Sequence, residues 1–173
     1  MILRIFFLLL SLSFLLPLTS AHAQTVTIDN SEYRKKVLKY LSSDYFITEG
    51  LGLQSVFIGQ SLEQLTGALG QPVKKKKQGT FSGLVIYSYQ LDKQTALQVG
   101  IKKGKVQAIA LAGAVSSQYT TVKGARFGMT AHEVINYYGV TPIKNNQLLY
   151  RSQGIRFDFK NNRLFVIRIF PKQ

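Results

Sequence analysis

Few side chains in this sequence could take part in catalysis or metal binding. Those few are not grouped in a recognisable motif. His132 is the only histidine beyond the first 23 residues, so a serine–histidine–acid triad would have to use it. It precedes Glu133 at the start of an expected helix, where an exposed surface position is the simpler interpretation. Paired acid and base catalysis would have to draw on carboxylates that are far apart in sequence: Asp44, Glu49, Asp92 and Asp158. We therefore expect no catalytic residues, and a hydrolase with dispersed carboxylates is the second alternative.

Metal, disulfide and nucleotide chemistry lack their usual motifs. The chain has no cysteine, which excludes a disulfide framework and cysteine-ligated zinc or iron–sulfur sites. It contains no histidine cluster, no H-E-x-x-H motif and no calcium-binding loop. Gly50-Leu51-Gly52 lacks the third glycine and the following helix of a phosphate-binding motif. We therefore expect no metal and no cofactor.

Positive charge is the strongest functional signal. The 173 residues carry 22 lysines and arginines against 8 acidic side chains, a formal net charge of +14. Two lysine-rich segments form a candidate basic docking patch: Lys74, Lys75, Lys76, Lys77, Lys102, Lys103 and Lys105. Adjacent ammonium groups repel one another, so we expect the first four in an exposed loop or at an exposed strand start. The patch could hold an anionic envelope surface or an acidic protein, or it could only keep the chain in solution.

Two tyrosines give a weaker signal for binding. Tyr87 and Tyr89 fall on one face of an expected strand, so they are candidate aromatic contacts on a sheet. The alternative is half-buried packing with the hydroxyl at the edge, which is the more common role of a tyrosine in a sheet.

The first 23 residues have the pattern of a secretory signal peptide. Arg4 is followed by an apolar run from Ile5 to Leu16, and Ala21-His22-Ala23 is a small-x-small cleavage site. The run is shorter than the about 20 residues that a membrane-spanning helix needs. No cysteine follows it to carry a lipid. We therefore expect a periplasmic or secreted protein that is not a lipoprotein and has no transmembrane segment after cleavage. Export also argues against nucleic acid as the partner of the basic residues.

Beyond residues 1–23, the sequence divides into three parts. Residues 24–54 contain a basic amphipathic helix from Ser31 to Ser42 and a connector, and residues 55–113 and 114–173 form two copies of one pattern. In each copy a glycine precedes a short helix that begins with a capping box, and a second glycine and a proline end the helix. The matching structural residues are Gly59, Ser61, Gly70 and Pro72 in the first copy and Gly128, Thr130, Gly139 and Pro142 in the second.

Three strands are expected after each helix. They cover Leu84 to Leu91, Thr95 to Ile101 and Val106 to Ala112 in the first copy, and Gln147 to Arg151, Ile155 to Lys160 and Arg163 to Phe170 in the second. Asn161-Asn162 suits a two-residue hairpin, because both residues can take positive φ. We therefore predict an α+β fold of two tandem repeats, each one short helix followed by a three-stranded antiparallel meander, preceded by the basic N-terminal helix. The two repeats would share one core or form one continuous sheet.

The glycine, cap and proline pattern of these two copies resembles the SmpA/OmlA family, and the tandem arrangement is similar to the fold of the β-lactamase inhibitory proteins. The resemblance covers roughly residues 55 to 170. It implies an exported, non-catalytic protein that binds other proteins through a sheet face. The expected function is therefore a protein-binding or envelope-accessory role, with another envelope or secreted protein, or an anionic envelope surface, as partner. Inhibition or modulation of a secreted hydrolase is the first alternative.

Overall fold

The computed structural model describes residues 45–53, 55–78 and 83–173. The predicted signal peptide and the predicted basic helix from Ser31 to Ser42 lie outside these residues. The elements follow in the order β1 (Phe46–Ile47), α2 (Leu62–Leu69), β2 (Lys74–Gln78), β3 (Leu84–Asp92), β4 (Thr95–Lys102), β5 (Lys105–Gly113), β6 (Thr120–Thr121), α3 (Ala131–Tyr138), β7 (Gln147–Tyr150), the 3-10 turn η1 (Arg151–Gln153), β8 (Ile155–Lys160) and β9 (Arg163–Ile169).

Each α-helix begins at a capping box at the predicted position. The Ser61 hydroxyl accepts a hydrogen bond from the Gln64 N–H at 3.1 Å, and the Gln64 side chain accepts one from the Ser61 N–H at 3.0 Å. Thr130 and Glu133 make the same reciprocal pair, at 3.3 and 2.7 Å. Both helices have eight residues and end at a glycine, with φ of 73° in α2 and 88° in α3. A side chain would strain that left-handed backbone, so local sequence sets both ends of each helix.

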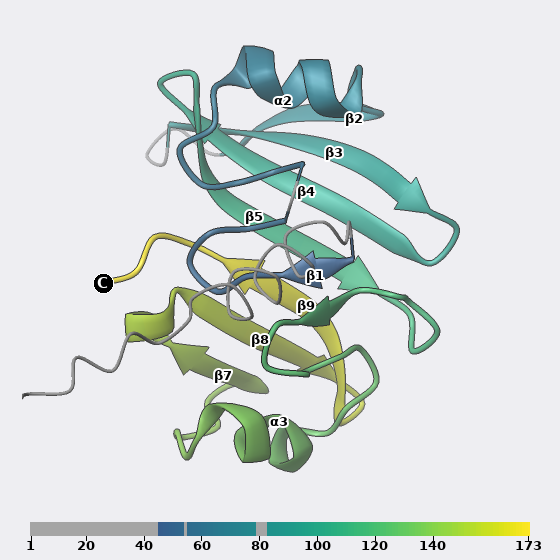
Figure 1. Cartoon of the computed structure of the whole chain (residues 1–173), viewed down its shortest axis with the longest axis vertical. Helices are drawn as coiled ribbons and strands as arrows, with labels where there is room; N and C mark the ends of the chain where they lie inside the picture. Colours follow the sequence, from purple (N-terminus) through teal and green to yellow (C-terminus); the bar gives the residue numbers. More distant parts are fainter. Residues whose placement is uncertain (1–44, 54, 79–82) are drawn as a thin grey trace, which may run out of the picture.

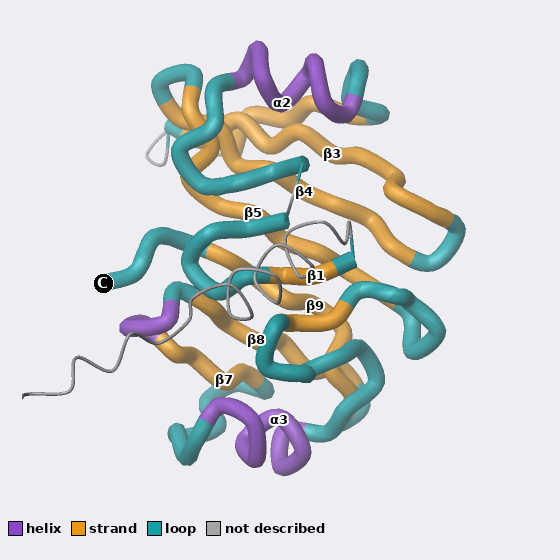
Figure 2. Tube along the Cα trace, in the orientation of Figure 1, coloured by secondary structure: helices purple, strands orange, loops and turns teal. Residues whose placement is uncertain are grey.

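One antiparallel sheet of seven strands joins the two halves of the chain, in the order β2-β3-β4-β5-β9-β8-β7 (Figure 1). At the junction, β5 pairs with β9 from Ile109 opposite Ile169 to Ala112 opposite Val166. The strand order is therefore mirrored about this pair, with β3-β4-β5 on one side and β7-β8-β9 on the other. Figure 2 shows the helices at opposite ends of the sheet, α2 near the β2 edge and α3 near the β7 edge. β1 and β6 form a separate two-stranded parallel sheet.

The first half has one strand more than the sequence predicted. Lys74–Gln78 pairs with β3 as the edge strand β2, so four strands follow α2 where three were expected. An edge position leaves the lysine side chains in solvent, which relieves their repulsion and blocks pairing with a further strand. In the second half, Arg151 is not the last residue of β7 but begins η1. The hairpin at Asn161-Asn162 is confirmed, with φ of 49° and 57°.

The loop before each helix is tied to the last strand of its own half by the same two hydrogen bonds. The Gly59 N–H donates to the Val106 carbonyl at 2.8 Å, and the Val106 N–H donates to the carbonyl of the residue after Gly59 at 2.9 Å. Gly128 and Leu164 repeat this arrangement, at 2.9 and 2.7 Å. The loops that lead into both helices are thus attached to the sheet through backbone groups.

The buried apolar side chains form one core drawn from both halves. The central pair of strands contributes Ile109, Leu111, Ile167 and Ile169, none more than 1% exposed. The helices bury residues such as Leu65 and Val134 in the same core, so they pack on the face of the sheet that these isoleucines occupy. Neither described helix is long and apolar enough to cross a membrane.

Candidate binding face of the sheet

The pairing register divides the sheet into a buried face and an open face. Residues directly opposite each other in an antiparallel sheet point to the same side, and neighbours along a strand point to opposite sides. One row across six strands is buried throughout: Tyr87, Val99, Ile109, Ile169, Ile155 and Tyr150. The adjacent row is half-buried or exposed throughout: Ser88, Gln98, Ala110, Arg168, Arg156 and Leu149. No described helix covers this second, open face.

Small side chains lower the middle of the open face. β5 places Ala108, Ala110 and Ala112 on it at every second position, and Gly100 of β4 lies opposite Ala108. Gly100, Ala108 and Ala110 form part of a central hollow of about 150 Å³. Its other lining residues are Leu84, Ile86, Gln98, Ile109, Arg156, Arg168, Ile169 and Phe170. A wider depression of about 570 Å³ lies at the other end of β5, where Ala112 and the exposed Phe165 contribute. The open face therefore has an apolar floor with two arginines beside it.

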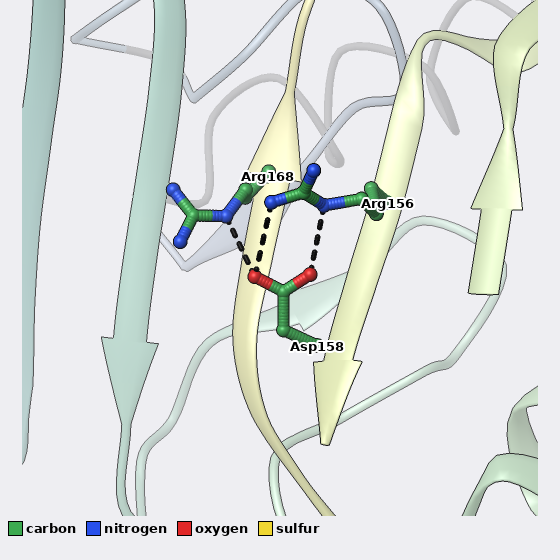
Figure 3. Close-up of polar contacts among 3 residues, drawn as sticks. All are labelled: Arg156, Asp158 and Arg168. Atoms are coloured by element: carbon green, nitrogen blue, oxygen red, sulfur yellow. Dashed lines mark hydrogen bonds and ion pairs between the residues drawn. The ribbon is translucent and has the colours of Figure 1, made fainter. Parts of the chain in front are cut away.

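A three-residue ion cluster borders the central hollow (Figure 3). Arg156 donates from Nε to Asp158 Oδ1 at 2.8 Å and from Nη2 to Oδ2 at 3.3 Å. Arg168 donates from Nε to Asp158 Oδ2 at 2.6 Å. The side chains are 30%, 41% and 16% exposed for Arg156, Arg168 and Asp158, so solvent reaches the arginines more than the carboxylate. One carboxylate faces two guanidinium groups, which leaves one positive charge unneutralised. Asp158, one of the carboxylates dispersed along the sequence, thus forms ion pairs with both arginines.

The predicted basic patch is divided between an edge strand and a turn. Lys74–Lys77 are exposed on β2. Lys74 and Lys76 point to the open face, whereas Lys75 points to the other face, where its Nζ lies 5.1 Å from the centroid of the Tyr87 ring. The remaining lysines are exposed around the β4–β5 turn: Lys102, Lys103 and Lys105. Lys77, Val85 and Ile101 form one row across β2, β3 and β4. The two lysine groups therefore lie at the same end of the sheet, with backbones about 10 Å apart.

Tyr87 and Tyr89 do not lie on the open face and pack in the core, as in the alternative to aromatic sheet contacts. Both belong to the hydrophobic core, at 6% and 5% exposure. β3 is apolar on both faces, with Val85 and Ile86 side by side, so alternation alone did not decide which face would be buried. The Tyr89 hydroxyl has no hydrogen-bond partner among the described residues, and burial, with a smaller effect of Tyr87, raises its pKa.

The residues considered for catalysis lie at separate places. His132 is exposed on the first turn of α3. Glu49 accepts a hydrogen bond from a tyrosine hydroxyl, Asp92 accepts one from a backbone N–H at 2.6 Å, and Asp158 holds the two arginines. Asp44 lies outside the described residues. In the parts of the chain that the structure describes, no three metal-ligating side chains converge.

The central hollow is the feature that the sequence analysis missed. Its signal was present, because alanine recurs at every second position from Ala108 to Ala112 on a strand whose other face is apolar. The pairing of β5 with β9 was not readable from sequence, and that pairing places Arg168 opposite Ala110. The hollow and the arginines therefore become one site only in the folded chain.

The sequence model of the family described as CAP-associated N-terminal matches residues 58–168, a region that contains both described α-helices. This family is different from the SmpA/OmlA family that the capping pattern suggested. No curated protein matches the chain.

Solved structures match the chain at low sequence identity and low TM-score. A cysteine-rich secretory protein from Staphylococcus aureus is 14% identical with a TM-score of 0.44, and an extracellular protein containing an SCP domain from Bacillus anthracis is 16% identical with a TM-score of 0.45. Each match covers 66% of this chain but only 43% and 44% of those proteins, so the chain spans less than half their length. A candidate beta-lactamase inhibitor protein from Streptococcus mutans is 17% identical over 79% of this chain and 93% of its own, with a TM-score of 0.32. At TM-scores below 0.5, none of these three matches bears on the fold of this chain.

Proposed function

Since this chain belongs to the CAP-associated N-terminal family, we propose that it is an exported, non-catalytic protein that binds a partner protein through the open face of its sheet. The family description names an associated part, which fits a module that acts beside another protein or domain. The observation that carries the proposal is the open face itself, where an apolar hollow is bordered by arginines and left uncovered by the described helices.

The composition of this face is that of a binding surface. Contiguous apolar surface with a polar rim marks interaction sites, and arginine is enriched in protein interfaces relative to the rest of the surface. Exposed lysines, by contrast, gather at the sheet edge and the β4–β5 turn. A partner that buries the hollow would leave those lysines at the rim, where charge speeds association more than it adds affinity.

Site-specific photocrosslinking tests this proposal. A photoreactive amino acid replaces Gln98, which is exposed on the open face, and as a matched control Asn136, which is exposed on α3. We expect a crosslinked partner from position 98 in the periplasmic or secreted fraction, lost when unlabelled chain competes, and none from position 136. Equal crosslinking from both positions, or crosslinking from position 98 only to residues 24–44 of the same chain, would contradict it. Recovery of a single hydrolase would favour the inhibitor alternative, and envelope components the accessory role.

The lysines of β2 make a second, electrostatic contribution to the proposed role. Lys74–Lys77 form an exposed cationic edge that an anionic envelope surface could attract. We expect retention on anionic vesicles that weakens as salt rises, because screening shortens the reach of surface charges to about 8 Å at physiological ionic strength. Replacement of all four lysines by glutamine should abolish the retention. Binding that is equal at low and high salt would remove the electrostatic part of the proposal.

Absence of catalysis is part of the same proposal. A screen with ester, peptide and glycoside substrates should show no turnover with the full chain. His132→Ala and Asp158→Asn are the controls, because they remove the only histidine beyond residue 23 and the carboxylate at the ion cluster. Turnover that either change abolished would overturn the non-enzymatic assignment.

We also infer that the two halves are copies of one unit. The equivalent capping boxes, the repeated loop-to-strand hydrogen bonds and the mirrored strand order support this. Equivalent substitutions should then have equivalent effects: Ser61→Ala and Thr130→Ala are each expected to lower the free energy of unfolding by about 1 kcal/mol. A large loss for one and none for the other, in urea unfolding, would argue against structural equivalence.

A further inference from the structure

We propose that the central hollow and the arginine pair recognise an extended peptide segment of the partner, in which an aspartate or glutamate stands two residues from a large apolar side chain. This inference rests on the proposed function, because it states what the open face would hold. It adds the chemistry of the partner and the residues that read it.

The arginine pair is arranged to receive an anion. Arg156 and Arg168 stand directly opposite each other on β8 and β9, a pairing of like charges that destabilises a sheet. Asp158 offsets one of the two charges. Its bond to Arg168 uses Nε alone, so both terminal nitrogens of Arg168 lack a hydrogen-bond partner in residues 45–53, 55–78 and 83–173. Figure 3 shows them turned away from Asp158 toward the neighbouring strand β5.

A carboxylate is the anion that this geometry suits. The guanidinium group is planar, and two of its N–H groups can donate in parallel to the two oxygens of one carboxylate. Asp158 holds Arg168 through Nε and leaves the outer edge of the guanidinium group, with its two terminal nitrogens, turned away from Asp158. Little side-chain entropy would then be lost on binding, which favours affinity at such a preorganised site.

The hollow beside the arginines is matched to one side chain. Its volume of about 150 Å³ is that of an apolar cavity that can hold benzene. Leu84, Ile86 and Phe170 form apolar parts of its lining, and Ala108 and Ala110 leave the floor low. A phenylalanine or leucine side chain would therefore fill it, whereas a small residue would leave it partly empty.

The arginines and the hollow adjoin each other, and this sets the spacing of the segment. Arg156 and Arg168 line the hollow themselves. In an extended chain, residues two apart point to the same side and are separated by about 6.6 Å. A segment lying on the sheet could therefore place an acid at Arg168 and, two residues away, an apolar side chain in the hollow. The residue between them would point away from the sheet.

A library of bead-linked octapeptides with acetylated N-termini tests the inference, because the bead linkage removes any free terminal carboxylate. We expect the full chain to enrich peptides with an acid two residues from Phe, Leu, Ile or Trp. For a selected peptide measured by fluorescence anisotropy, Arg168→Gln should weaken binding by roughly 10-fold or more, and so should changing the peptide's Glu to Gln. Arg168→Lys keeps the positive charge but lacks the planar guanidinium group, so its affinity for the peptide should lie between those of the wild-type chain and Arg168→Gln.

Matched variants separate this site from general charge attraction. Arg151→Gln removes the same charge from η1, which is not part of the open face, and should leave the affinity within about 2-fold. Ala110→Leu fills the hollow and should remove the preference for a large apolar side chain while the preference for an acid remains. A cooperative urea transition with a midpoint close to that of the wild-type chain shows that each variant is folded.

Several results would overturn the inference. These are no enrichment, enrichment without the two-residue spacing, an Arg168→Gln effect no larger than that of Arg151→Gln, or binding that needs a free terminal carboxylate. Anionic vesicles that bind in an Arg168-dependent way, with no peptide selected, would assign the site to a lipid headgroup instead. In each case a partner crosslinked from position 98 would leave the proposed function standing, whereas loss of that crosslink would remove the proposed function itself.

Discussion

Replacing Tyr138 by phenylalanine is expected to weaken the attachment of α3 to the segment that precedes α2. The Tyr138 side chain is 6% exposed, and its hydroxyl donates a hydrogen bond to Glu49 Oε1. Its ring packs against Tyr150 and Phe157, with centroids 5.3 and 4.7 Å away, and Lys123 Nζ lies 4.9 Å from its centroid. The substitution keeps these ring contacts and removes one hydrogen bond to a carboxylate.

The magnitude follows from that single bond. A hydrogen bond to a charged group contributes about 1.5–3 kcal/mol, and solvent access to the half-buried Glu49 favours the lower end. We therefore expect Tyr138→Phe to reduce the free energy of unfolding by about 1.5 kcal/mol. For a chain of this size, the melting temperature should fall by roughly 3–6 °C.

Urea unfolding followed by far-ultraviolet circular dichroism measures this loss. Tyr137→Phe is the matched control, because Tyr137 is the adjacent residue of the same helix, 47% exposed, and should change stability by less than about 0.5 kcal/mol. In a double-mutant cycle with Glu49→Ala, which leaves no acceptor at position 49, the two losses should not add, since both substitutions remove the same bond. Equal effects of Tyr137→Phe and Tyr138→Phe, or full additivity in the cycle, would refute the reasoning.

The same hydroxyl predicts how stability changes with alkaline pH. Burial, and then the hydrogen bond to Glu49, raise the pKa of Tyr138 well above its ordinary value of 10.0. Above about pH 10 the unfolded chain would lose this proton while the folded chain keeps it, so stability is present below that pH and declines as pH rises. The alkaline decline in urea midpoint should be smaller in Tyr138→Phe than in the wild-type chain.

Two further predictions concern the second capping box and the packing of glycine. The backbone and hydroxyl hydrogen bonds from Thr130 lower the pKa of Glu133 below 4.5, so its contribution to stability is present above that pH and is lost as pH falls through the folded value. Glu133→Gln should therefore slightly lower the urea midpoint at neutral pH, where the ionised carboxylate contributes, and flatten its fall between about pH 5 and pH 3; an identical acid profile would contradict this. Gly113→Ala would place Cβ 2.5 Å from a ring carbon of the buried Phe127 and should cost about 1–3 kcal/mol of unfolding free energy. Gly67→Ala, with no atom within 4 Å of the new Cβ in α2, should instead stabilise by about 0.5–1 kcal/mol. If Gly113→Ala proved more stable than Gly67→Ala in urea unfolding, the described contact between Gly113 and Phe127 would be wrong.

Sequence predicted the features that depend on neighbouring residues. Capping boxes, terminal glycines and the Asn161-Asn162 hairpin each involve groups within four residues of one another, so their residue types are sufficient to specify them. The strands of both halves fell close to their expected bounds for the same reason. β2 was the exception, because the repulsion within Lys74–Lys77 left an exposed loop and an exposed strand start both open, and pairing with β3 decided for the strand.

The candidate site could be predicted only in its parts. Ala110 and Arg168 are 58 positions apart, and neither residue type alone indicates that they share a face. For Tyr87 and Tyr89, both faces of β3 were apolar enough to be buried, so the decision rested with the helices and loops that pack there.

The amino-acid order by itself determined where helices and turns begin and end, the chain's strong positive charge and the α+β character, since each follows from short-range bonding or from composition. Only the tertiary structure decided that β5 meets β9, which side chains enter the core, and that two arginines border an apolar hollow. The physical reason is that cross-strand register is set by the joint burial of side chains from both halves, and no local segment contains that information.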